Sequence, residues 1–237
     1  MQIVWVVSKK EFASFFNSPI AYVFVAVFLA LANWLFFQGF FLAGQATMRE
    51  FFGVLPWLYL LLVPAITMRE WAEEKRSGTI EVLLTLPITD LQATLSKFFG
   101  SLAFLGFALA LSLTIPLSVS VIGSLDAGPV IGGYVGALLL GGAYISLGLA
   151  ISSVTKNQII AFLLTVSIAF FMFIIGEDVV TSSVAQGLRP LLRFLSLGFH
   201  FSNLTRGIVD SRDVVYYLSF IILFLHINSK SLESRNL

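Results

Sequence analysis

Long apolar stretches separated by short polar segments make up most of the chain. Six of them predict membrane-spanning helices, because about 20 apolar residues at 1.5 Å per residue cross a hydrocarbon core of roughly 30 Å. The third is longer than a membrane requires, and the sixth is short enough to need Tyr216, Tyr217 and His226 as interfacial anchors. The predicted spans are residues 20–42, 51–66, 89–122, 130–153, 159–175 and 214–227.

Local signals set several helix boundaries. Ser18 precedes Pro19, which is tolerated at the first position of a helix. Thr89 and Gln92 have the spacing of a capping box and predict the start of the third span. Pro56 and Pro64 lie inside the second span and predict a kink or a break there.

Two other segments have mixed polarity. Residues 1–18 predict an amphipathic helix in the membrane interface, because large apolar residues fall on one face and Lys9, Lys10 and Glu11 on the other. Residues 177–213 alternate apolar and polar groups, too apolar for a free loop and too short for a span. They predict short re-entrant or interfacial helices.

The densest run of charge follows the second span. Arg69, Glu70, Glu73, Glu74, Lys75 and Arg76 stand together, and we expect this run to sit in water. Gly78 interrupts it, and Thr79 to Pro87 then predict a short capped helix with an apolar face. Residues 68–89 therefore form either a docking element for a soluble protein or an ordinary interfacial loop.

Composition supports one polytopic, all-α membrane domain over residues 1–237. The chain is 58% hydrophobic and 11% charged, against about 25% charged in soluble domains. The net charge of +1 argues against nucleic acid as a partner, and the absence of cysteine excludes thiol chemistry. The N-terminus lacks the order of a cleavable signal.

The fourth span is rich in small residues. Gly132 and Gly136, and then Gly142 and Ser146, repeat the four-residue spacing that allows helices to pack closely. Packing within one subunit and packing between two subunits explain this pattern equally well.

The distribution of basic residues predicts the orientation. Six spans place both termini and the charged run on one side, with most of the lysines. The positive-inside rule assigns that side to the cytoplasm. The other side carries Arg49, Arg189, Arg193, Arg206 and Arg212.

Motifs for catalysis and metal binding are absent from the sequence. There is no phosphate-binding loop for ATP, and His200 and His226 are too far apart to suggest a metal site. Glu177-Asp178 and Ser152-Ser153 are interpreted as helix ends rather than catalytic groups. The spans hold almost no ionisable residues, which argues against a carrier driven by its own ion gradient. We expect no catalytic residues and an external source of energy.

Several stretches resemble ABC-2 type permeases, and in particular the gliding-motility-associated subfamily. The resemblance rests on R-E-W-A-E-E-K-R-S-G-T-I-E-V-L-L-T-L-P-I-T-D at residues 69–90, with support from residues 10–22, 55–69, 148–158 and 199–217. It implies a six-span subunit of a bacterial inner-membrane exporter, working as a homodimer or heterodimer.

The resemblance also implies a coupling helix that docks on a separate ATPase subunit, where ATP and Mg²⁺ would bind. The positions carried over are Glu73, Glu74, Lys75, Arg76, Gly78, Thr79, Glu81, Leu83 and Leu84. We expect a permease that couples ATP hydrolysis to export. The alternative is a non-transporting subunit that transmits force to envelope or motility machinery through a periplasmic partner.

Overall fold

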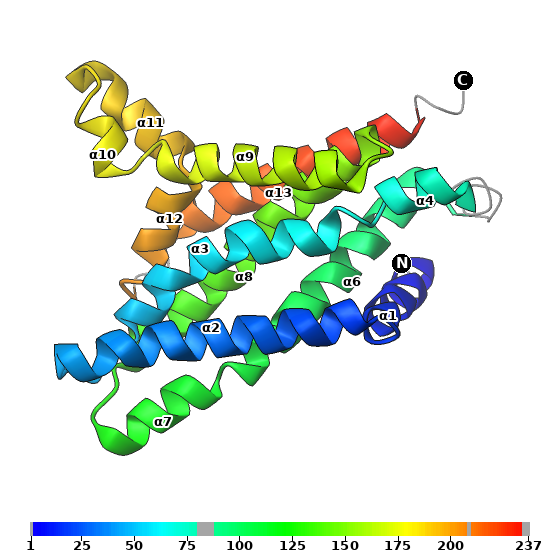
Figure 1. Ribbon diagram of the computed structural model, residues 1–237. Helices are drawn as coiled ribbons and strands as arrows, with labels where there is room; N and C mark the ends of the chain where they lie inside the picture. Colours follow the sequence, from blue (N-terminus) through cyan, green and yellow to red (C-terminus); the bar gives the residue numbers. More distant parts are fainter. Residues whose placement is uncertain (1, 80–87, 208–209, 234–237) are drawn as a thin grey trace.

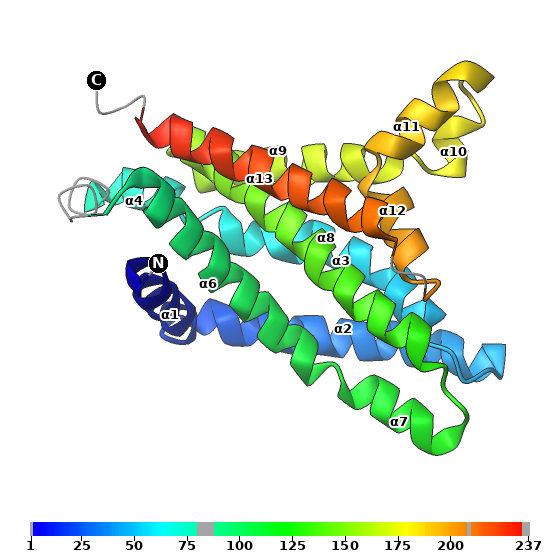
Figure 2. The same cartoon turned by 180° about the vertical axis from the view of Figure 1, so that it is seen from behind.

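The computed structural model is a bundle of long helices, seen from two sides in Figures 1 and 2. The structure describes residues 2–79, 88–207 and 210–233, and within these ranges it contains no β-strand. The elements are α1 (Gln2–Phe16), α2 (Pro19–Ala43), α3 (Arg49–Thr67), α4 (Ala72–Ser77), α6 (Asp90–Leu111), α7 (Thr114–Ile122), α8 (Ala127–Val154), α9 (Gln158–Ile174), α10 (Asp178–Thr181), η1 (Gln186–Leu188), α11 (Arg189–Leu195), α12 (Leu197–Leu204) and α13 (Ser211–Glu233).

The apolar stretches form the long helices. Five helical segments of the described residues are long and apolar enough to cross a membrane, namely Pro19–Phe41, Arg49–Ser77, Asp90–Ile122, Ala127–Val154 and Ser211–Glu233. The fifth predicted span is α9, an apolar helix of 17 residues. At 1.5 Å per residue, α9 is roughly 26 Å long, close to the thickness of a hydrocarbon core.

The predicted third span is interrupted rather than continuous. Helix α6 ends at Leu111 and α7 begins at Thr114. Pro116 has no N–H to bond the carbonyl of Ser112, and the Ser112 hydroxyl donates to Leu109 O over 2.7 Å. The capping box at its start is confirmed, with the Thr89 and Gln92 side chains each bonded to the other residue's amide.

The prediction of a short sixth span is wrong. Helix α13 runs from Ser211 to Glu233, because polar residues at both ends find partners on neighbouring helices. In its first turn Asp213 contacts His200 of α12, and in its last turns Ser231 donates to Ser153 O of α8 over 3.3 Å. The apolar stretch from residue 214 to residue 227 is therefore shorter than the helix that contains it.

Helix α8 is the centre of the bundle, in contact with α3, α6, α9, α12 and α13. Its small residues allow this approach. A Cβ at Gly132 would lie 2.4 Å from Leu204 O, and one at Gly142 would lie 3.1 Å from Ile221 Cδ1. Gly136 also faces Leu204, and Ser146 is fully buried. Helices of the same chain therefore cover these positions, so packing within the subunit accounts for the pattern.

The molecule has two distinct ends (Figure 1). Helices α1 and α4 and the last turns of α13 lie at one, which we call the α4 end; α7, α10 and α11 lie at the other, the α11 end. The predicted N-terminal helix is present as α1, which packs along α6. The segment 177–213 contains short helices, as predicted.

Candidate functional site

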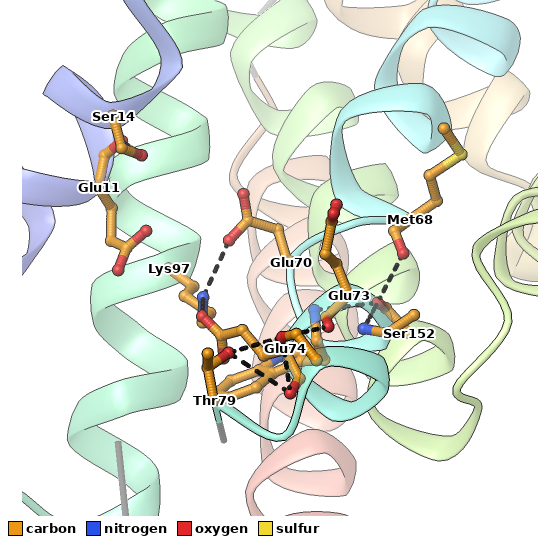
Figure 3. Close-up of polar contacts among 12 residues, drawn as sticks. Glu11, Ser14, Met68, Glu70, Glu73, Glu74, Thr79, Lys97 and Ser152 are labelled. Carbon is orange, nitrogen blue, oxygen red and sulfur yellow. Dashed lines mark hydrogen bonds and ion pairs between the residues drawn. The ribbon is translucent and has the colours of Figure 1, made fainter. Parts of the chain in front are cut away.

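The charged run after α3 surrounds a buried lysine from another helix. Lys97 of α6 lies 3.3 Å from Glu70 Oε2 and 2.7 Å from Glu74 Oε1, and only 4% of its side chain is exposed. Its Nζ also lies 4.9 Å from the centre of the buried Trp71 ring. Glu11 of α1 adds a third carboxylate that interacts electrostatically with Lys97 (Figure 3). This lysine therefore joins α1, α6 and α4.

A serine of α8 holds the turn between α3 and α4. Ser152 Oγ donates to Met68 O over 3.0 Å and accepts the backbone N–H groups of Trp71 at 3.2 Å and Ala72 at 3.1 Å (Figure 3). The N-terminus of α4 has no side-chain cap of its own, so Ser152 takes that role from a distant part of the chain. The position of α4 is thus tied to α8.

The expectation that the whole charged run sits in water is wrong for Lys75. This side chain is buried and its Nζ donates to Ser153 O at the end of α8. A lysine can cross apolar surface with its stem and satisfy its ammonium on helix carbonyls. Lys75 therefore fixes α4 from the inside.

Other residues of the predicted coupling set face outwards. Glu73, Arg76, Gly78 and Thr79 are exposed, and Gly78 ends α4 with a left-handed φ of 75°. Glu73 is held by Arg69 Nε at 3.1 Å and by Gln158 Nε2 at 3.0 Å. Glu81, Leu83 and Leu84 lie outside the described residues. The exposed side of α4 is a mixed-charge surface.

Such an arrangement can transmit movement between helices. The contacts around α4 are ion pairs and backbone hydrogen bonds, which can pass a displacement of α4 to α6 and α8 without a chemical step.

At the α11 end, burial and the neighbouring Asp178 raise the pKa of Glu177, while Asp178 pairs with Arg193 at 3.0 Å.

Sequence reasoning missed the central residues of this site. The sequence interpretation placed Ser152 at a helix end and did not single out Lys97, yet these two residues position α4. A lysine about two turns inside a predicted span, opposite a run of glutamates, is the signal that could have indicated a buried ion cluster. Nothing in the sequence pairs Ser152 with residues 68–72, because that contact depends on how α3 and α8 pack.

Comparison with known proteins identifies the family. The model for "ABC-2 family transporter protein" matches residues 51–227, from α3 into α13. Among curated proteins, none matches the chain. The family match covers most of the chain and agrees with the long apolar helices. The chain therefore belongs to the ABC-2 transporter family and is a multi-pass membrane permease component of an ABC transporter.

Proposed function

We propose that α4 and the residues after it dock on a separate ATPase subunit and transmit its movements to the bundle. One observation carries this proposal: α4 is fixed to α6 and α8 on its inner side while Glu73 and Arg76 face outwards. Charged residues around a docking element give orientation and specificity to an interface. The chain itself would bind neither ATP nor Mg²⁺ and would not act as an enzyme.

The coupling follows from the contacts at α4. A shift of α4 would move α8 through Ser152 and α6 through Lys97, since the bonded groups move together. The ATPase subunit can drive such a change only if it binds two conformations of the permease with different affinity. ATP binding and hydrolysis on the partner would supply that difference, and the bundle would alternate between two states.

We further propose two permease subunits, identical or different, in a bacterial inner membrane with the α4 end in the cytoplasm. The positive-inside rule supports this orientation, because Lys9, Lys10, Lys156 and Lys230 accompany α4 at that end. The resemblance of residues 69–90 also supports placement in the gliding-motility-associated subfamily.

A second candidate function is force transmission to an outer partner. Helices α10 and α11 project from the bundle (Figure 2), and Leu188, Leu191 and Phe194 are each more than half exposed there. An exposed apolar surface of this kind suits a periplasmic auxiliary protein. Reconstituted complexes separate the two: a solute stimulates the ATPase of an exporter, whereas a protein partner stimulates that of a force transducer.

Charge exchange at α4 tests the docking. In Glu73→Lys/Arg76→Glu the net charge is unchanged, yet the affinity for the ATPase subunit should fall at least tenfold in co-purification at low ionic strength. The matched control is Asp178→Lys/Arg193→Glu, which exchanges an exposed pair at the α11 end. Equal co-purification of the ATPase with both variants, each with unchanged thermal unfolding, would refute the docking proposal.

A further inference from the structure

Two adjoining cavities form a cleft at the α11 end. One, of about 540 Å³, is lined by Thr47, Arg49, Phe52, Pro129, Ser202, Thr205 and Arg206, and we call it the headgroup cavity. The other, of about 450 Å³, is mostly apolar and shares Arg49, Phe52, Ser202 and Thr205 with the first. Because four residues line both, one ligand can occupy the two together. The proposed docking at α4 uses neither cavity.

The headgroup cavity is cationic. Arg49 at the start of α3 and Arg206 just after α12 are both exposed, and neither lies within 4.0 Å of a carboxylate among the residues that the structure describes. Thr47 accepts a hydrogen bond from the Arg49 amide and keeps its own hydroxyl hydrogen for donation. Two guanidinium forks beside one hydroxyl suit an oxyanion with several oxygens.

The second cavity offers aromatic surface to an apolar chain. Trp57 is half exposed and packs against Phe173 with ring centres 5.3 Å apart, and Phe52 and Pro56 continue the same wall. Glu177 is the carboxylate in its lining. Desolvation and the neighbouring Asp178 raise the pKa of Glu177.

We propose that this cleft binds an anionic amphiphile, with its oxyanion headgroup between Arg49 and Arg206 and its apolar chain along Trp57 and Phe173. A small soluble anion would leave the aromatic wall unused, and a cationic amphiphile would meet the guanidinium groups of Arg49 and Arg206. The inference deepens the proposed export function, because this ligand class would be the exported substrate. Only that identification rests on the proposed function.

Quenching of Trp57 tests the proposal on the permease alone, in nanodiscs of zwitterionic lipid and without an ATPase subunit. The probe is ω-bromoundecyl phosphate, whose bromine quenches tryptophan fluorescence, and Trp57→Phe identifies the share due to Trp57. We expect saturable quenching with a Kd at least tenfold lower than for ω-bromoundecyl trimethylammonium. Inorganic phosphate should compete only weakly.

Variants locate the headgroup. Arg49→Gln and Arg206→Gln should each raise the Kd for the phosphate probe about tenfold, and Arg49→Lys should have a smaller effect. Arg212→Gln removes a charge from the same end outside the cleft and should change nothing. Equal affinity for both probes, equal loss in Arg212→Gln, or full competition by inorganic phosphate would overturn the proposal. Docking of the ATPase could still hold, since this assay does not involve it.

Discussion

Lys97 and Ser152 determine how the charged run after α3 is arranged. Lys97 places an ammonium among carboxylates from α4 and the turn before it, while Ser152 satisfies two amides at the start of α4. A buried charge costs several kcal/mol when its partner is lost, and a buried amide about 1–3 kcal/mol. The two residues should therefore affect stability by different amounts.

Replacing Lys97 with methionine should lower the free energy of unfolding by about 3–5 kcal/mol, because the largely buried Glu70 and the partly exposed Glu74 would lose their cation. Thermal unfolding in detergent would measure the loss. Adding Glu70→Gln to the Lys97→Met variant should restore part of the lost free energy of unfolding. Lys230→Met, which breaks an exposed pair with Glu233, is the control and should leave the unfolding temperature unchanged.

Replacing Ser152 with alanine should cost about 1–3 kcal/mol, since the amides of Trp71 and Ala72 would lose their acceptor. Those amides should also exchange hydrogen faster. Ser153→Ala is a matched control: that hydroxyl is equally buried but donates to Ala150 O of its own helix. Similar exchange at Trp71 in both variants would mean that Ser152 does not hold the turn.

Binding of an anionic amphiphile should strengthen as the pH falls. The raised pKa means that Glu177 takes up its proton at a higher pH than a free glutamate, and its protonation makes the cleft more positive. The neighbouring carboxylate of Asp178 is paired with Arg193 at 3.0 Å. ω-Bromoundecyl sulfate, which does not titrate between about pH 7 and about pH 4, should show the change, and Glu177→Gln should abolish it.

At the scale of single residues, the sequence predicted which residues of the charged run are exposed better than it predicted their contacts. The exposed Glu73 and Arg76 lie on the surface as expected for a docking element, but Lys75 points inwards. The difference depends on the end of α8, which brings Ser153 O next to α4. A pattern within residues 68–89 holds no information about that distant carbonyl.

At the scale of elements, α1 is attached to α6 by a close approach at one glycine. A Cβ at Gly100 would lie 2.7 Å from Glu11 Cβ and 3.4 Å from the backbone of Ser8 and Phe12. The stacked rings of Phe15 and Phe104, 4.7 Å apart, continue this contact. Helix α1 is therefore held at a fixed position on α6, close to the Lys97 cluster.

Gly100→Ala should push α1 away from α6 and cost about 1–3 kcal/mol, because the clashing atom, Glu11 Cβ, is fixed to the backbone of α1 and cannot move aside like the end of a flexible side chain. Gly106→Ala on the same helix meets only Leu138 Cδ2 at 3.7 Å and should be neutral or stabilise by about 0.5–1 kcal/mol. Thermal unfolding of the two variants makes the comparison. Equal stability would show that α1 packs less closely than described.

Most elements could be predicted, because apolar length and capping are local properties. Ser18 and Pro19 begin α2, and Thr89 begins α6, as their sequences indicate. The break at Ser112 was missed although Pro116 was visible, since proline inside α3 at Pro56 and Pro64 leaves that helix continuous. Whether a proline breaks a membrane helix depends on whether neighbouring groups satisfy the freed carbonyl.

For the molecule as a whole, the two ends have different chemistry. The α4 end carries ion pairs around an exposed helix, and the α11 end carries a cleft lined by Arg49 and Arg206. The export proposal needs the first end in the cytoplasm, where an ATPase subunit can reach it, and the second outside. Orientation is therefore the property on which ATPase docking and export both depend.

Single cysteines can determine the orientation, because the natural sequence has none and every label reports one site. Ser77 at the end of α4 and Ser183 after α10 are both exposed. In right-side-out vesicles a membrane-impermeant maleimide should label Ser183→Cys and spare Ser77→Cys, since charged reagents do not cross the bilayer. In inverted vesicles the result should be reversed. Labelling of Ser77→Cys from the outer side would place α4 beyond the reach of a cytoplasmic ATPase, and the docking proposal would fail with it.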